Sequence, residues 1–451
     1  MPRLLSRLGN SMSEWKSRRL GDLIDIRGGL SYKSKYIDSG DAKLLGMGCV
    51  SFSQRFLLSG CRSYAGEYTR KYLVEEGDLV IATRQQSENL PILGFPAMIP
   101  SGMNGADIIV GTNLYKVDNQ SNFTNSFLFW LMRGEGYRSH VKACASGSTV
   151  RMITKDVILD YCFACPSEKE AEAIATFLNR IEDKIELNQK MNQTLEEIAK
   201  AIFKSWFVDF DPVRAKAEGR PTGLPREISD LFPDELVDSE IGEIPKGWRT
   251  SSLLSLCKKI ESGGTPSRKT SEYWDAGTIS WFKTGEFCDS PLLKSEENIT
   301  PLGLEKSAAK EWSPETILFA MYGATVGKMA YLTETGTANQ AVAGISPDEH
   351  FGFAFVWQTL ISGRSRLMSL ANGAAQQNLN LGLVKDFTVI TPSAELARTF
   401  SDMTDSIYQR ITLLHKESDC LSTLRDTLLP KLISGELRIP DAEKFLEEAG
   451  I

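Results

Sequence analysis

The strongest constraint on the fold is that the chain repeats itself. The segment that starts at Trp15, WKSRRLGDLIDI, resembles the segment that starts at Trp248, WRTSSLLSLCKKI, at an offset of 233 residues. Farther along, residues 147–181 resemble residues 373–407 at an offset of 226. Similarity at a fixed long period indicates two copies of one structural unit. Each copy contains a globular part that is followed by a long helical pattern.

The two helical patterns are the clearest local prediction. From Ser167 to about Phe207 apolar residues recur at heptad spacing, and the pattern returns after Pro392. Each pattern begins after a proline, with a serine cap and an acidic first turn. At about 1.5 Å per residue, some 40 residues would form a helix about 60 Å long. The apolar rows contain Ile174, Ile181, Leu195 and Ile202, with Leu178, Ile185 and Ala199, in the first helix, and Phe400, Ile407, Leu414, Leu421 and Leu428 in the second.

An apolar stripe on each helix needs a partner surface. Asn188 and Asn192 interrupt the first stripe, and Ser418 and Arg425 interrupt the second. Polar residues at such positions are typical of paired helices whose register is specified. We therefore expect the helices to pair as an antiparallel coiled coil. The alternative is that each helix packs only on its own globular part, which the periodicity alone does not exclude.

The predicted fold class is α+β, with two globular domains separated by two long helices and related by an internal pseudo-twofold repeat. Short apolar runs such as GDLVIATR and KMAYLT, bounded by Gly, Pro and Asn, predict strands and turns, and NSFLFWLMRGEGYRSHV predicts helix. The expected boundaries are a first domain at 1–165, a helix at 166–211, a proline-rich connector at 212–247, a second domain at 248–392, a second helix at 393–437 and a tail at 438–451.

The charge is unevenly distributed along the chain. The net charge of −7 argues at first against a nucleic-acid partner. However, residues 1–160 carry 20 Lys and Arg against 15 Asp and Glu, whereas residues 161–247 carry 11 against 18. DNA binding needs a local cationic face rather than a basic chain. Basic residues alternate with aromatic ones in both globular parts, although an ordinary solvated surface of mixed charge has the same composition.

The sequence lacks the usual catalytic and metal-binding patterns. GATVGK, from Gly323, has one residue too few between its glycines for a phosphate loop, and Met329 follows its lysine. Cys162 and Cys165 have CxxC spacing but lack a second pair of ligands, so we expect them to be buried strand residues. We predict no catalytic residue and no metal site. No apolar run is long enough for a membrane helix and no signal peptide precedes the first domain, so we expect a cytoplasmic protein.

Several motifs together resemble the specificity subunits of type I restriction-modification systems. They are IGEIPKGWR at 241–249, SGGTPSRKTSEYW at 262–274, ISWFKTGEF at 279–287, SGSTVRMITKDVILDY at 146–161, KSWFVDFDPVRAKAEG at 204–219 and LLPKLISGELRI at 428–439. The resemblance covers nearly the whole chain, including the order of globular part and helix. The first globular part departs most from the pattern, because IRGGLSYKSKYIDSG only loosely matches the glycine-rich motif of the second.

The resemblance implies a non-catalytic subunit that recognises double-stranded DNA. Each globular part would be a target recognition domain for one half of a split DNA sequence, and the helices would fix the distance between the halves. Two modification subunits, which bind S-adenosylmethionine and methylate adenine, would dock on the helices. ATP-dependent restriction subunits with nuclease and translocase activity would join them. This chain itself would bind no cofactor, because S-adenosylmethionine, ATP and Mg²⁺ belong to the partners.

The candidate site residues lie in predicted loops and at one helix end. The DNA-binding candidates are Lys33, Lys35, Arg84, Gln85 and Gln86 in the first domain and Ser262, Thr265, Arg268, Lys269, Gln376, Gln377 and Asn378 in the second. The candidates for partner docking are Trp206, Phe207 and Phe210, which alternatively pack on a neighbouring domain. Two other functions stay open: a scaffold whose globular parts bind proteins, and a nuclease or methyltransferase that acts alone.

Overall fold

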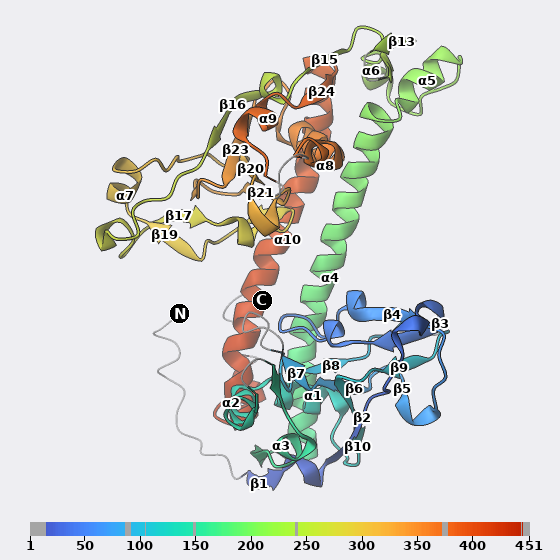
Figure 1. Ribbon diagram of the computed structural model, residues 1–451, viewed down its shortest axis with the longest axis vertical. Helices are drawn as coiled ribbons and strands as arrows, with labels where there is room; N and C mark the ends of the chain where they lie inside the picture. Colours follow the sequence, from blue (N-terminus) through green and yellow to red (C-terminus); the bar gives the residue numbers. More distant parts are fainter. Residues whose placement is uncertain are drawn as a thin grey trace. The chain divides into compact units, whose positions relative to one another are not determined.

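The structure, a computed structural model, describes residues 15–85, 92–103, 105–147, 150–239, 242–371, 378–442 and 444 (Figure 1). The chain forms two compact units, and each of them is assembled around parts of both long helices. Unit 1 comprises Met1–Ile185 and Cys420–Ile451, and unit 2 comprises Glu186–Asp419. Each helix therefore begins in one unit and ends in the other.

The two long helices are α4 (Glu168–Phe207) and α10 (Ala394–Ser434), green and red in Figure 1. Their starts have the predicted serine caps. The backbone N–H of Glu170 donates to Ser167 Oγ at 3.3 Å, and the Glu170 carboxylate accepts from the Ser167 N–H at 3.1 Å. This reciprocal pair satisfies two backbone donors of the first helical turn.

The antiparallel pairing of the helices is confirmed within each unit separately. In unit 1, Glu182 of α4 pairs with Arg425 of α10, and the earlier Glu170 pairs with Arg438, just beyond α10. The partner number falls as the α4 number rises. In unit 2, Asn188 bonds Glu417, and farther along α4 the ring of Phe203 lies 5.6 Å from that of Phe400. The helices also pack on the globular parts, so pairing and domain packing occur together.

Unit 1 contains two main sheets and short helices. The first sheet has the order β2 (Ile24–Gly28), β10 (Leu114–Asn119), β6 (Leu79–Ala82) and β8 (Pro96–Met98), and the second has β4 (Cys61–Tyr64), β3 (Ile37–Leu45), β9 (Ile108–Val110) and β5 (Leu73–Val74). Two-stranded ladders join β1 (Lys16–Arg19) to β12 (Cys162–Cys165) and β7 (Arg84–Gln85) to β11 (Arg151–Met152). The helices are α1 (Asn125–Arg133), α2 (Glu135–Cys144) and α3 (Lys155–Leu159).

Unit 2 has the same plan with additions. Its main sheet has the order β16 (Cys257–Ser262), β23 (Val342–Pro347), β20 (Ile317–Ala320), β21 (Met329–Leu332) and β18 (Ser290–Leu292), and a smaller one has β19 (Glu297–Ile299), β17 (Ile279–Phe282) and β22 (Thr337–Ala338). Ladders join β13 (Leu236–Ser239) to β14 (Gly242–Pro245) and β15 (Arg249–Ser252) to β24 (Thr388–Thr391). The helices are α5 (Asp211–Ala217), α6 (Arg226–Ser229), α7 (Pro301–Glu305), α8 (Phe353–Ser369) and α9 (Leu381–Lys385).

The strand register confirms the internal repeat. Lys16 pairs with Cys165 in unit 1, and Arg249 pairs with Thr391 in unit 2. These four positions are related by the two offsets found in the sequence, 233 and 226. The connector holds α5, α6 and the β13–β14 hairpin, and Phe210 takes a left-handed conformation (φ 58°) where α4 gives way to α5. No helix in the described part of the chain is both long and apolar enough to cross a membrane.

Candidate functional site

Two loops meet in each unit at the end of a central strand, and we call this place the loop junction. In unit 1 the Ile153 N–H donates to the Thr83 carbonyl, just beyond β6, at 3.2 Å. In unit 2 the Leu379 N–H donates to the Met321 carbonyl, just beyond β20, at 2.9 Å. Ile153 and Leu379 are separated by the repeat offset of 226. The two repeats thus build the same junction, and several predicted DNA-binding residues lie at it.

The unit 1 junction carries Arg84 and Gln85. Both lie on β7, which pairs with β11 so that Gln85 is opposite Arg151. Arg84 is exposed, whereas Gln85 is only 9% exposed and lines a cavity of about 260 Å³. The third predicted residue, Gln86, lies outside the described residues. Strand pairing thus fixes the backbone of Gln85 at the edge of this cavity.

This cavity is lined by both basic and apolar side chains. Its lining residues are Gln85, Leu93, Phe95, Glu135, Arg138, Ser139, Val141, Lys142 and Arg151. Three of them are cations and one is a carboxylate. The guanidinium of Arg138 lies 4.6 Å from the ring centre of Phe52, a residue that is 42% exposed beside the cavity. A lining with three cations beside apolar side chains suits a phosphate and an aromatic base better than a peptide of mixed charge.

A buried arginine fixes the loop that carries Phe52. Arg133 of α1 is 7% exposed and donates to the carbonyl oxygens of Ser51 at 3.4 Å, Gln54 at 3.0 Å and Phe52. Burial lowers the pKa of Arg133 to about 10, and the Glu182 carboxylate opposes this shift. Arg133 therefore stays charged at neutral pH. Its fork of donors replaces the solvent that the loop carbonyls would otherwise need.

The unit 2 junction carries Asn378, the one described member of the predicted Gln376–Asn378 group. Gln376 and Gln377 lie outside the described residues. Asn378 is exposed, and its Oδ1 accepts a long hydrogen bond, 3.5 Å, from the Gly323 N–H. Tyr322, 37% exposed, and Lys328, also exposed, flank the same turn. This turn joins antiparallel β20 and β21, whereas a phosphate loop leads from a strand into an α-helix, so GATVGK does not have the structural context of a phosphate loop.

In the glycine-rich segment of unit 2, two of the predicted DNA-binding side chains already contact other residues of the chain. Ser262 ends β16 and is half-buried, and Thr265 donates its hydroxyl hydrogen to Gln340. Arg268 stacks 3.6 Å from the ring centre of Trp274 and forms an ion pair with Glu297. These contacts hold the Arg268 guanidinium in place and offset its charge. Lys269 is exposed.

The two lysines of the first domain lie on a different part of unit 1 from the loop junction. Lys33 and Lys35 are exposed beside the start of β3, and Lys35 lies 4.7 Å from the ring centre of Tyr36. They lie at the short 3-10 turn Ser34–Tyr36 that leads into β3, while Arg84 follows β6 of the other main sheet. The predicted mixture of cations and tyrosines therefore exists as a surface of its own.

The predicted docking residues are buried inside unit 2. Trp206, Phe207 and Phe210 are 3%, 5% and 5% exposed. The ring of Phe207 lies 5.4 Å from Phe400, and that of Phe210 lies 5.6 Å from Trp248. In this structure the three rings close the core around the end of α4, as the alternative of domain packing describes.

A second apolar row on α4 was missed in the sequence. Leu187 and Ile198 are 51% and 44% exposed, and Met191 and Ala201 continue the row at heptad spacing, with the polar Thr194 between them. The heptad pattern could have revealed this row, because its residues occupy different heptad positions from those that face α10. The residue one repeat offset after Leu187 is Leu413, on α10, which is 57% exposed.

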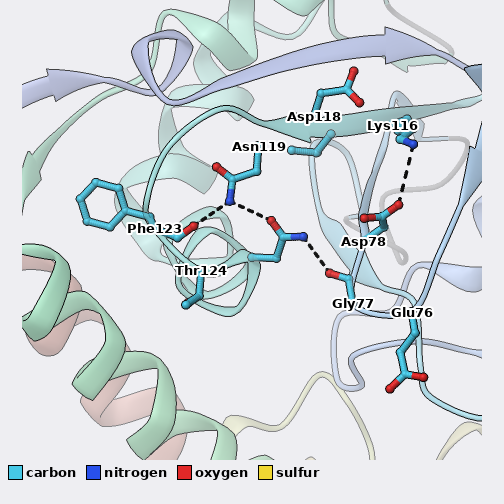
Figure 2. Close-up of a pocket in the computed structure, with 10 residues that line it drawn as sticks. Glu76, Gly77, Asp78, Lys116, Asp118, Asn119, Phe123 and Thr124 are labelled. Carbon is cyan, nitrogen blue, oxygen red and sulfur yellow. Dashed lines mark hydrogen bonds and ion pairs between the residues drawn. The ribbon is translucent and has the colours of Figure 1, made fainter.

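A larger cavity of about 530 Å³ in unit 1 is unsuited to DNA (Figure 2). Its charged lining residues are Glu76, Asp78, Lys116 and Asp118. Its amides bond neighbouring groups: Asn119 donates to the Phe123 carbonyl at 2.6 Å and to Asn125 Oδ1 at 3.0 Å, and Asn125 donates to the Gly77 carbonyl at 2.9 Å (Figure 2). Three carboxylates would repel a phosphate, so this polar network joins strand ends rather than binding DNA.

The cysteine pair is structural in its position but only half buried. Both residues lie on β12, as predicted, yet Cys162 is exposed while Cys165 is buried. The expectation that both are buried is wrong for Cys162, because alternate side chains of a strand point to opposite faces. Within the described ranges, no three His, Cys, Asp or Glu side chains lie close enough together to hold a metal ion.

Comparison with known proteins agrees with this two-repeat architecture. The family model described as type I restriction modification DNA specificity domain matches residues 12–197 and again residues 245–421. The HindI specificity subunit of a type I restriction enzyme from Haemophilus influenzae is 27% identical, with 94% of this chain and 100% of the relative covered. The MjaIX specificity subunit from Methanocaldococcus jannaschii is 22% identical, with 96% of each chain covered.

A solved structure has the same fold. The crystal structure of a type I restriction-modification S subunit from M. genitalium matches with a TM-score of 0.59 at 14% identity, over 95% of this chain and 98% of that one. At this identity the match concerns the fold alone. The family match covers both repeats and most of the sequence. The chain therefore belongs to the type I restriction modification DNA specificity domain family.

Proposed function

We propose that this chain is the non-catalytic DNA-recognition subunit of a type I restriction-modification complex and that each repeat recognises one half of a two-part DNA target. The loop junction carries this proposal, because the same backbone contact presents polar side chains in both units. The match of the family model to each repeat supports it. Such a subunit would act in the cytoplasm, where the DNA of the host lies.

The side chains at the junctions suit the edges of bases. An arginine such as Arg84 can bond guanine with two donors, and an amide such as Gln85 or Asn378 can bond adenine. Lys142 and Arg138 of α2 would contact phosphates beside the unit 1 junction. Other candidates would position the duplex through contacts with the sugar-phosphate backbone of the DNA. They are Lys33, Lys35, Lys269, Ser262 and Thr265.

The helices would serve as spacer and as docking surface. We propose that α4 and α10 set the distance between the half-sites, so that deleting one heptad from each changes the spacing by several base pairs. The exposed row at Leu187 and Ile198 suits an amphipathic helix of a modification subunit. Because Leu413 repeats Leu187 on the other helix, two copies of the same subunit could bind similarly. S-adenosylmethionine would be bound by these subunits, and ATP and Mg²⁺ by the restriction subunits.

Methylome sequencing of cells that carry the chain and its modification subunits tests the proposal. We expect one two-part adenine-methylated motif. Gln85→Ala should change or weaken only one half of it, while Arg226→Ala, at an exposed position of the connector, should leave both halves unchanged. Methylation without a two-part motif would contradict the proposal.

Two measurements distinguish the proposed function from a scaffold and from a self-sufficient enzyme: the salt dependence of DNA binding and the activity of the purified chain alone. DNA binding by the complex should fall steeply with salt and prefer the methylated sequence, because phosphate contacts release counterions. Equal affinity for all duplexes at every salt concentration would favour the scaffold. Turnover of DNA by the purified chain alone, with Mg²⁺ and S-adenosylmethionine, would favour the self-sufficient enzyme.

A further inference from the structure

We propose that the buried ion pair between Glu182 and Arg425 fixes the register of α4 against α10 and thereby determines the number of base pairs between the two half-sites. The pair lies inside unit 1 and joins α4 to α10. The last step of this inference rests on the proposed function. The first step rests on the geometry of the pair alone.

The two charges are almost completely removed from solvent. Glu182 is 1% exposed and Arg425 is 4% exposed, and the Arg425 Nη1 lies 2.5 Å from the Glu182 Oε2. Arg425 Nε bonds Asp426 at 2.8 Å. The surrounding helix residues are apolar: Leu178, Ile181, Ile185, Leu421, Leu424 and Leu428 belong to the same buried cluster. A buried pair of this kind gains little stability over two apolar side chains, because desolvation offsets the attraction. Glu182 also supports the charge of the buried Arg133, but Arg425 opposes that charge, so the pairing of Glu182 with Arg425 needs a further reason.

Register is such a reason. An apolar heptad pattern repeats every seven residues, so apolar contacts alone distinguish poorly between one register and the next. A shift by one heptad would place Arg425 opposite Ala175 and Glu182 opposite Ser418 in one direction. In the other direction it would place Arg425 opposite Gln189 and Glu182 opposite Leu432. None of these four partners carries a charge, so Glu182 and Arg425 would lose each other at once, and Arg425 would keep only the neighbouring Asp426. Unpaired buried charges are far more costly than a changed apolar contact.

The second repeat shows that the fold does not itself require the pair. One repeat offset relates Glu182 to Tyr408 and Arg425 to Ala199, both in unit 2. These residues are buried, at 5% and 0% exposed, and the Tyr408 hydroxyl accepts a bond of 2.8 Å from Gln358. The same helix positions thus pack without an ion pair in the other unit.

Unit 2 has a different polar contact between the helices. Asn188 is 0% exposed and donates to Glu417 at 2.8 Å. The positions one offset from these residues are Leu414 and Met191, which are apolar. The polar contacts are therefore not shared by the two copies of the repeat. A symmetric pair of two first helices would place Glu182 opposite Ala199, so the ion pair also favours pairing of the two different helices.

The size of the effect follows from helix geometry. A slip of seven residues moves one helix by about 10 Å along the other, at about 1.5 Å per residue. Duplex DNA rises about 3.4 Å per base pair, so this displacement corresponds to roughly 3 base pairs. A spacer of defined length needs one register, and the ion pair selects it.

The test uses the full-length chain in complex with its modification subunits and measures the spacing between methylated half-sites by methylome sequencing. The variants are E182L/R425L, in which both charges become leucine, and E182R/R425E, in which they are exchanged. R410L places the same arginine-to-leucine change on the exposed face of α10 and serves as the control. Thermal unfolding of each complex accompanies the sequencing.

We expect E182L/R425L to fold but to methylate at the wild-type spacing and at spacings about 3 base pairs away. The exchanged pair should restore the single spacing, and R410L should not change it. A single wild-type spacing in E182L/R425L, failure of the exchanged pair to restore it, or a leucine pair that does not fold would overturn the inference. If the wild-type complex methylates no two-part motif, the proposed function fails instead.

Discussion

Substitution of the buried Arg133 by methionine tests how the loop beside the unit 1 junction is held. Methionine keeps much of the side-chain length but removes every donor that reaches the carbonyls of Ser51, Phe52 and Gln54. Ser51 is buried, so its carbonyl would lose its partner, whereas Phe52 is exposed and water could replace the arginine there. We therefore expect the loop to loosen while the core beneath it stays packed.

The expected magnitude follows from these contacts. Hydrogen bonds to a charged group contribute about 1.5–3 kcal/mol each, and a buried carbonyl without a partner costs about 1–3 kcal/mol. Arg133 also lies 5.1 Å from the ring centre of Phe129, a cation–π contact that methionine removes. Release of a buried charge offsets part of this loss. We estimate a net destabilisation of about 3 kcal/mol, or roughly 6–12 °C in the midpoint for a unit of this size.

Hydrogen exchange gives the local measurement. The amides of Ser53 and Gln54 donate to Ser51 Oγ at 3.2 and 3.1 Å, so they should exchange faster in R133M while amides of α1 change less. Arg133→Lys, which keeps the charge but not the fork of donors, should give an intermediate shift. A variant with the wild-type midpoint and unchanged exchange at residues 51–54 would refute this account of the loop.

Three other substitutions give independent checks. Glu196 is exposed, yet desolvation and the neighbouring carboxylates of Asp289 and Glu197 raise its pKa to about 7. Its ionisation should therefore cost stability as the pH rises from about 4.5 to 7, so Glu196→Gln should raise the unfolding midpoint slightly at pH 8 and have little effect at pH 5. Gly264→Ala should lower the midpoint strongly, because the added carbon would lie 2.3 Å from backbone atoms, whereas Gly285→Ala meets nothing within 4 Å and should be nearly neutral in the same melting experiment. Leu187→Lys with Leu413→Lys should weaken binding of modification subunits in a pull-down at an unchanged midpoint, and equal binding would exclude this row as the docking surface.

The sequence predicted those parts of the fold that depend on periodicity and repetition. Heptad spacing predicts helices at 166–211 and 393–437, and α4 and α10 span Glu168–Phe207 and Ala394–Ser434. The two offsets predict a repeated unit, which the equivalent ladders of Lys16 with Cys165 and Arg249 with Thr391 contain. Whether the aromatic residues at the end of α4 are buried was harder to predict. Side chains such as Trp206 look the same in sequence whether they pack in their own core or bind a partner. Contacts between distant residues were not predictable: Arg268 meets Glu297 only because two strands and a turn bring them together.

Unit 1 is built from two chain segments that are synthesised at different times. Its core includes Leu421, Leu424 and Leu428, which leave the ribosome long after Ile185. At about 5–20 residues per second, some 235 residues take roughly 12–47 s. During this interval the first half of α4 has an apolar row without its partner, while unit 2, which is continuous in the chain, can fold first. Unit 1 is therefore the last to be completed, and a chain that loses its final 32 residues would retain an intact unit 2 beside an unfinished unit 1.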